Sequence, residues 1–430
     1  MTDGDNASGA LAGGVQAASE ADERAIARTR NWLIALLFFG TIINYVDRQV
    51  LSLLKPTISA EYGWGDAEFA HFASASQLAA AGALLFVGWI IDRFGVKLAY
   101  GAAVALWSVA GMAHAVAATV SQFVTARVAL VAFEAVNTPA AVKAAAEYLP
   151  IRQRTMGMGI VNTAPNIGNI LAPLTVVPFA VIYGWKAAFI VTGLLGFVWL
   201  AAWIWGTRDL RPLPRAARPE GTPVRSSYSE AFADRKTWAI AGAKAITDMF
   251  WWFFTFWLPD LFNKVFNLSQ TELVGPTALA FSMAAVGALT AGKLFGVLLG
   301  KGRSVNAARK TSMLLYGLII LPIPLALTVD SAWTAAAIIG LGLFAHQGFS
   351  TNIFGFAADA IPARRVATVM AIGAIAGNVA GFGIQEATGA LLTSGIGYAP
   401  LFWAAAVAYL TALAWIHLLV PKIVAEDEGQ

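Results

Sequence analysis

Six charged side chains lie within segments that are otherwise apolar enough to cross a bilayer: Asp47, Arg48, Arg127, Glu134, Lys244 and Asp248. An ionisable residue costs roughly 2.5–3.5 kcal/mol at the centre of a membrane helix on insertion scales, so such residues mark functional sites by default. Three cations balance three acids in this set. One added monoanion would leave an excess negative charge that one proton removes, so the set indicates coupled binding of an anion and a proton.

Helix geometry fixes the relative directions of the first four charges. Arg127 and Glu134 are seven residues apart, so they lie within about 20° on one helix face and about 10.5 Å apart along the axis. This separation is too long for a simple ion pair and suits an anion site beside a proton site; alternatively, both residues neutralise groups on neighbouring helices. Asp47 and Arg48 point about 100° apart, so one can face a polar path while the other faces a neighbouring helix.

A polar and aromatic stripe follows one face of the segment 237–264. Lys244, Asp248 and Trp251 recur at positions i, i+4 and i+7. A sugar acid would suit this stripe, with an aromatic ring over the sugar and a Lys–Asp pair for hydroxyl groups or charge. The alternative is a packed tryptophan cluster with an internal ion pair. Trp252 lies about 80° from the stripe and is a weaker candidate.

Amide side chains offer a further set of candidates. Asn162, Asn166 and Asn169 follow at i, i+4 and i+7 around Pro165. Such amides can bind hydroxyl groups of a ligand, and they can also bind neighbouring helices. Weaker candidates are His346, Gln347 and Asn378. His346 fits an interhelical hydrogen bond better than a proton carrier.

The composition excludes several classes of protein. The 430 residues are 58% hydrophobic and 13% charged, against about 25% charged in a soluble domain. The chain has no cysteine, which excludes disulfides, thiol nucleophiles and thiolate metal sites, and its four scattered histidines do not indicate a metal centre. We expect neither a cofactor nor a metal. The net charge of +4 is explained by basic loops at a membrane and does not indicate nucleic acid.

Twelve apolar blocks divide the chain into two sets of six. The blocks lie at approximately 31–54, 68–91, 98–119, 121–147, 154–180, 185–206, 237–264, 272–300, 309–329, 332–359, 364–394 and 398–420. Each is long enough to be a membrane-spanning helix. A polar, proline-rich segment separates the sixth block from the seventh.

Lysine and arginine residues predict the orientation. Loops rich in these residues stay in the cytoplasm, and most of the 29 fall on the side of the two chain ends. Lys55, Lys186 and Lys264 fall on the opposite side. We expect both termini in the cytoplasm and this organisation: a disordered cytoplasmic tail (1–29), a six-helix half (30–206), a cytoplasmic linker (207–236), a second six-helix half (237–421) and a cytoplasmic tail (422–430).

The loop between the second and third blocks carries the motif G-x-x-x-D-R-x-G-x-[RK]. Its residues are Gly88, Asp92, Arg93, Gly95 and Lys97. The motif resembles the loop 2–3 signature of the major facilitator superfamily. The glycines would make a tight turn, and Asp92 would form a cytoplasmic latch with basic groups that breaks when the two halves move. A purely structural turn is the alternative.

Four stretches carry a closer resemblance: Asn44–Arg48 (NYVDR), Arg127–Glu134 (RVALVAFE), Lys244–Trp252 with Trp257–Pro259, and Phe344–Gln347 (FAHQ). Together they resemble the anion:cation symporter family, and within it the hexuronate and aldonate transporters. The resemblance implies that Asp47 and Glu134 are the protonatable pair. It also implies that Arg48 and Arg127 hold the substrate carboxylate, and Tyr45 of the first stretch is a further candidate contact. Arginine suits this role because its planar fork binds a carboxylate bidentately.

The resemblance implies an all-α membrane protein with the twelve-transmembrane-helix major facilitator fold and two pseudo-symmetric halves. The implied function is proton-coupled import of a hexuronate, such as galacturonate or glucuronate, across the bacterial inner membrane by a monomer that is not an enzyme. Asn166 falls where related sugar-acid transporters place a polar substrate contact. The alternatives are a symporter of another organic anion (an aldonate, an aldarate or an aromatic acid) and, from another class, a transport-derived membrane sensor.

Overall fold

The computed structural model describes residues 4–210 and 228–423, and this part of the chain is helical without strands. The N-terminal half consists of α1 (Gly4–Tyr62), α2 (Asp66–Phe94), α3 (Val96–Ala113), α4 (Val120–Glu134), α5 (Asn137–Tyr148), α6 (Ile151–Val161), α7 (Ala164–Tyr183) and α8 (Trp185–Thr207). The C-terminal half consists of α10 (Arg235–Phe266), α11 (Val274–Gly300), α12 (Val305–Ile319), the 3₁₀ helix η1 (Ile323–Leu327), α13 (Ala332–Ala360), α14 (Ala363–Thr393) and α15 (Ala399–Leu419). The short helix α9 (Tyr228–Ala233) precedes α10.

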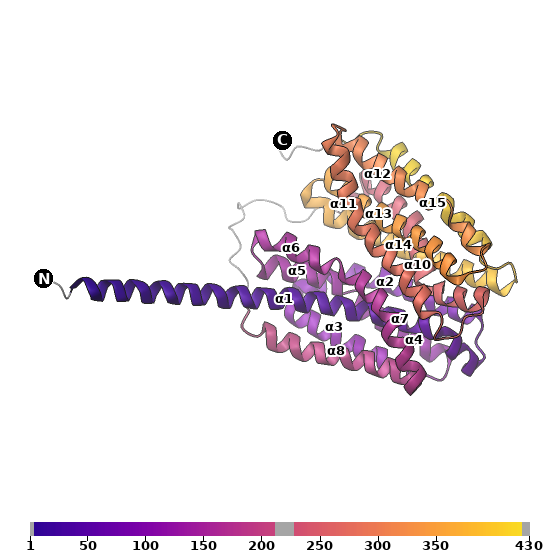
Figure 1. Ribbon diagram of the computed structural model, residues 1–430, viewed down its shortest axis with the longest axis horizontal. Helices are drawn as coiled ribbons and strands as arrows, with labels where there is room; N and C mark the ends of the chain where they lie inside the picture. Colours follow the sequence, from indigo (N-terminus) through magenta and orange to yellow (C-terminus); the bar gives the residue numbers. More distant parts are fainter. Residues whose placement is uncertain (1–3, 211–227, 424–430) are drawn as a thin grey trace.

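The two halves form separate bundles that lean against each other (Figure 1). Helix α2 packs against α14, α7 against α11, and α1 against α10. We call the end where α8 ends and α10 begins the linker end, and the end where α1 meets α2 the far end. The bundles diverge toward the linker end and come together at the far end (Figure 1).

Eleven helical segments among the described residues are long and apolar enough to cross a membrane, some of them combining two adjacent helices. The twelfth predicted block corresponds to α10, whose 32 residues also suffice for a membrane crossing. This helix carries Lys244, Asp248, Asp260 and Lys264, which reduce its mean hydropathy. The twelve-helix arrangement expected from the sequence is thus confirmed.

Two predicted spans are interrupted rather than continuous. The first interruption separates α4 from α5 at residues 135–136, and the second separates α6 from α7 at residues 162–163. Pro139 has no N–H to bond the carbonyl of Ala135, and Pro165 lies in the first turn of α7, where proline is tolerated. The first interruption places Glu134 at the last turn of α4.

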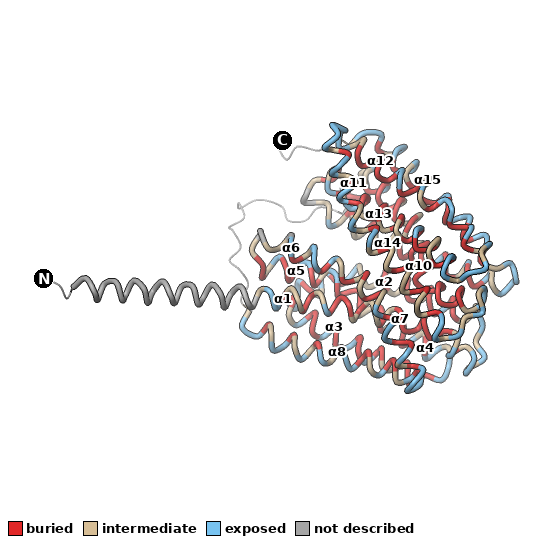
Figure 2. Tube along the Cα trace, in the orientation of Figure 1, coloured by how far each residue is buried: buried red, intermediate tan, exposed pale blue. Residues whose placement is uncertain are grey.

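Large apolar side chains lie both inside the bundles and on their outer surface. One buried core lies within the N-terminal half and includes Trp107 and Trp203, and a second core, which includes Trp257, extends across both halves. Figure 2 shows this buried interior in both bundles. Val198 and Leu418, for example, are exposed over 67% and 75% of their surfaces. Such an apolar surface is expected of a multi-pass membrane protein, because lipid replaces water around it.

The segments outside the bundles differ partly from expectation. The tail 1–29 was expected to be disordered, whereas α1 already begins at Gly4. This segment contains many alanines, the strongest helix formers. The predicted linker 207–236 contains α9, and its residues 211–227 lie outside the described residues. Most of the predicted C-terminal tail, residues 424–430, also lies outside them.

Close packing in the C-terminal half gives a first prediction. A Cβ atom at Gly287 of α11 would overlap the backbone of Phe344 on α13, whereas a Cβ at Gly292 of α11 would meet nothing within 4 Å. We expect Gly287→Ala to lower the apparent melting temperature in detergent, since overpacking costs about 1–3 kcal/mol. Gly292→Ala is the matched control, and it should be neutral or slightly stabilising. Equal melting temperatures for the two variants would contradict this account of the packing.

Candidate functional site

Arg48 of α1 lies between the two halves and pairs with the acid at the end of α4. Its Nε donates to Oε2 of Glu134 at 3.0 Å. Its Cζ lies 5.3 Å from the ring centroid of Tyr45 and 6.0 Å from that of Trp252, a residue of α10 in the other half. The spacing of Asp47 and Arg48 does not decide which of the two faces the interface of the halves, and the structure places Arg48 there.

Asp47 points away from the C-terminal half. Its side chain is buried and lies beside the hydroxyl group of Thr192 on α8. It remains in the electrostatic field of Glu134 and Arg127, so it belongs to the same charged group. Asp47 therefore lies farther from the C-terminal half than Arg48 does, inside the N-terminal bundle.

Arg127 of α4 is fully buried, and only some of its N–H groups have hydrogen-bond partners. Its Nε donates to Oγ of Ser76 at 3.0 Å, and its Nη2 donates to the backbone oxygen of Arg48 at 3.1 Å. Its Nη1 and the Oε1 of Glu134 have no hydrogen-bond partner among the described residues. Buried polar atoms are rarely left unpaired. The orphaned donor and the nearby Arg48 guanidinium suit an anionic ligand, while the orphaned Oε1 can accept a proton.

The C-terminal half contributes the predicted stripe of α10. Lys244 Nζ lies 2.6 Å from Asp248 Oδ2, so these two residues pair with each other. The ring of Trp251 stacks on that of His346 with centroids 5.0 Å apart. The Nδ1 of His346 lies 2.8 Å from the hydroxyl oxygen of Tyr409 on α15. His346 thus takes part in an interhelical hydrogen bond, which was the first of the two roles considered for it.

The amide candidates are only partly brought together. Gln347 Nε2 donates to Asn166 Oδ1 at 3.4 Å, and this contact joins α13 to α7 across the two halves. Asn378 instead donates to the backbone oxygen of Ala374 within its own helix. Asn166 and Gln347 therefore lie at the interface of the halves, where a ligand between them could exchange for their mutual hydrogen bond.

Of the two glycines of the motif between α2 and α3, only Gly95 makes the turn, and Gly88 lies within α2. Gly95 has φ +77°, a conformation that favours glycine, and it separates the two helices. Asp92 lies 2.6 Å from Lys143 of the same half, and Lys97 donates to the backbone oxygen of Leu210 at 2.6 Å. Gly88 and Arg93 are exposed. In this conformation the acid of the motif is thus held within the N-terminal half, and its role as a latch stays a prediction.

Sequence reasoning missed several side chains that support the site. Ser76, Thr192 and Tyr409 contact the predicted residues. A lone hydroxyl in an apolar helix gives little sequence signal. Among the described residues, no group of three or more His, Asp or Glu could hold a metal ion.

The chain is similar to a known protein family, to individual transporters and to a solved symporter structure. The family described as Major Facilitator Superfamily matches residues 37–385. The Hexuronate transporter of Escherichia coli (strain K12) is 27% identical over 400 residues, covering 88% of this chain and 91% of that protein. The Probable L-galactonate transporter of the same strain is 28% identical over 367 residues, covering 81% of this chain and 80% of that protein. The crystal structure of a D-xylose-proton symporter has a TM-score of 0.71 at 14% identity, covering 93% of this chain and 99% of that one, and so shows the shared fold.

The pair formed by the partly buried Arg48 and the buried Glu134 generates a second prediction. Arg48→Met removes the cation beside a buried acid, and the loss of one partner of such a pair costs on the order of 3–5 kcal/mol. We expect a lower apparent melting temperature for this variant and substantial recovery in Arg48→Met/Glu134→Gln. The measurement is thermal unfolding in detergent without ligand, with the exposed Arg93→Met as control. Additive effects of the two substitutions would show that the pair is not coupled.

Proposed function

This chain belongs to the major facilitator superfamily, and from that premise we propose that it is a proton-coupled symporter that imports a hexuronate. Galacturonate and glucuronate are the proposed substrates. The proposal includes alternating access, in which the two halves rock around a site between them. It also includes placement in the bacterial inner membrane with both termini in the cytoplasm, which rests on the distribution of lysine and arginine.

The observation that carries the proposal is that the N–H groups of Arg48 can bind either Glu134 or a substrate carboxylate. This guanidinium is bonded to Glu134, and it lies at the interface of the halves beside Tyr45 and Trp252. A substrate carboxylate would compete for the same donors. Bidentate arginine–carboxylate pairs are among the stronger hydrogen-bonded pairs, so an entering carboxylate can release Glu134 from Arg48.

The released acid provides the proposed link to the proton. Glu134 is buried and its Oε1 has no partner, so an ionised Glu134 without Arg48 would be an unpaired buried charge. Such a charge is unfavourable, and protonation removes it. Binding of the substrate anion thus favours binding of a proton. Asp47, which is buried behind Arg48, is proposed as the second member of the protonatable pair.

Two observations support the substrate class: the names of the relatives and the polar and aromatic side chains between the halves. The two relatives described above are named for the transport of hexuronate and L-galactonate, which are sugar acids. On the C-terminal half, the pair of Lys244 and Asp248, the ring of Trp251 and the amide of Gln347 offer partners for a polyhydroxylated body. Asn166 of the N-terminal half adds a second amide beside Gln347. Trp252 would cover the ligand beside Arg48. A symporter of another organic anion is the second candidate, because the two arginines would bind any carboxylate.

Coupling is tested with Glu134→Gln. This variant keeps the size of the side chain and cannot bind or release the proton, so we expect proton-driven accumulation to be lost while exchange of substrate across the membrane persists. The measurement is uptake of labelled galacturonate in vesicles with an imposed proton gradient, compared with counterflow without one. Glu272→Gln, at an exposed carboxylate, is the control. Full accumulation by Glu134→Gln would refute the coupling role.

Ligand binding is tested by thermal shift of the purified protein at two pH values. A ligand that binds only the folded state at about 100 times its Kd adds about 2.7 kcal/mol of stability. We expect galacturonate or glucuronate to raise the apparent melting temperature, and the parent neutral sugars to have no effect. Arg127→Ala should abolish the shift, whereas Arg303→Ala, at an exposed loop residue, should retain it. Stabilisation by aromatic acids alone would favour the second candidate substrate class.

A further inference from the structure

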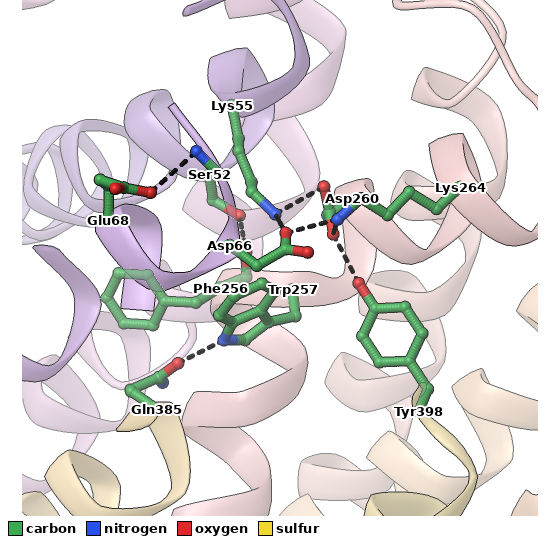
Figure 3. Close-up of polar contacts among 11 residues, drawn as sticks. Ser52, Lys55, Asp66, Glu68, Phe256, Trp257, Asp260, Lys264, Gln385 and Tyr398 are labelled. Carbon is green, nitrogen blue, oxygen red and sulfur yellow. Dashed lines mark hydrogen bonds and ion pairs between the residues drawn. The ribbon is translucent and has the colours of Figure 1, made fainter. Parts of the chain in front are cut away.

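A ring of four charges joins the two halves at the far end of their interface (Figure 3). Lys55 of α1 and Asp66 of α2 belong to the N-terminal half, and Asp260 and Lys264 of α10 belong to the C-terminal half. Lys55 Nζ lies 2.7 Å from Asp66 Oδ1 and 2.7 Å from Asp260 Oδ1. Lys264 Nζ contacts Asp66 and lies 3.3 Å from Asp260 Oδ2. Positive and negative charges therefore alternate around the ring.

The ring is embedded in side chains of both halves. Lys55 and Asp260 are buried, with 3% and 2% of their surfaces exposed. The Nζ of Lys55 lies 4.8 Å from the ring centroid of Phe69 on α2 and 4.3 Å from that of Trp257 on α10. The hydroxyl group of Tyr398 donates to Asp260 Oδ2 at 2.5 Å (Figure 3). The side of the ring formed by Lys55 and Asp260 is thus a built part of the interface, whereas Lys264 lies at its exposed edge.

The four ion pairs are of two kinds. Two join the halves: Lys55 with Asp260, and Lys264 with Asp66. Two lie within a half: Lys55 with Asp66, and Lys264 with Asp260. Separation of the halves at this end would break the first two pairs and preserve the other two. Each half would keep one cation and one acid as neighbours, so neither would expose a charge without a partner.

We propose that this ring is the outer gate of the protein, and that its alternating charges allow the gate to open without leaving an unpaired charge. The inference rests on the proposed function for its alternating access and membrane orientation. A buried ion that loses its partner is strongly destabilising, so an ordinary two-residue bridge buried at this place would oppose opening. In the ring, the in-half pairs compensate when the cross-half pairs break.

Two charge pairs at the linker end contrast with this arrangement. Lys143 pairs with Asp92 within the N-terminal half, and Arg309 pairs with Asp359 within the C-terminal half. The cross-half ring at the far end therefore fits a conformation that is closed outside, in agreement with bundles that diverge toward the linker end (Figure 1).

Two double variants with the same net charge separate the two kinds of pair. Lys264→Asp/Asp66→Lys keeps both cross-half attractions but places like charges together within each half, so the gate should stay closed. Lys264→Asp/Asp260→Lys keeps both in-half attractions but makes both cross-half contacts repulsive, so the gate should open. Reversal of all four charges restores the alternation and should restore the behaviour of the original protein.

Opening is measured on the chain's own background, which contains no cysteine. Ser52, one turn before Lys55, is fully buried and its Oγ donates to the backbone oxygens of Thr255 and Phe256 across the interface, at 3.1 and 2.6 Å. A single Ser52→Cys substitution thus reports opening through its reaction with a membrane-impermeant thiol reagent applied outside right-side-out vesicles.

We expect labelling at least about threefold faster in Lys264→Asp/Asp260→Lys and at least about threefold slower in Lys264→Asp/Asp66→Lys. Equal labelling rates in both variants, or the reverse order, would overturn the gate. If the charge-swap variants do not fold, the neutral variant Asp260→Asn/Lys264→Gln, which leaves no cross-half pair in the ring, must still label faster than the original; an unchanged rate there would also overturn it.

Labelling requires no substrate, so a wrong substrate assignment leaves these results unchanged. Inverted vesicles serve as the control for orientation. If Ser52→Cys reacts through the far end only in inverted vesicles, the proposed membrane orientation is wrong. The ring could then no longer be the outer gate. If labelling follows the predicted order but galacturonate and glucuronate are not transported, the gate stands and only the substrate is wrong.

Discussion

A charge inside an apolar bundle needs a partner in every conformation that the protein adopts, and helix α1 has to meet this constraint twice. Arg48 and Lys55 are seven residues apart on α1, so they lie within about 20° on one face, with Ser52 between them. All three contact the C-terminal half, through Trp252, through the backbone of α10, and through Asp260, respectively. The proposed site and the proposed gate are therefore carried by one helical face, and movement of α1 relative to α10 must change both.

The partners differ in kind, and the difference suits the two roles. Around Arg48 some polar atoms are orphaned, namely Nη1 of Arg127 and Oε1 of Glu134, so that region retains a donor and an acceptor that the proposed ligand and proton could use. Around Lys55 the charges satisfy one another in a closed ring. An incomplete set responds to a ligand, whereas a complete set responds to separation of the halves. The same constraint thus accounts for the proposed binding site in one place and for the proposed reversible contact in the other.

The sequence was sufficient to locate the membrane-spanning helices because apolar length is a local property. It located all twelve spans, including α10, despite the charges that this helix carries. The interruptions near Pro139 and Pro165 were not predicted, since a break of two residues barely changes the apolar length of a span. The sequence also gave the angle between Asp47 and Arg48, but which of them faces the other half depends on the rotation of α1 within the bundle. That rotation is set by contacts with α8 and α10, which lie far away in the sequence.

The two cations of the ring, Lys55 and Lys264, show the same limit of prediction from the sequence. Lys55 and Lys264 are two of the few lysines that the sequence places opposite the chain ends, where the positive-inside rule disfavours them. Their spacing in the sequence gives no sign that they share two acids. Once Asp66 and Asp260 are placed between them, the ring carries no net charge and its lysines have a reason to be there. A cation that the topology disfavours is thus best explained by a structural partner, and here the partners come from both halves.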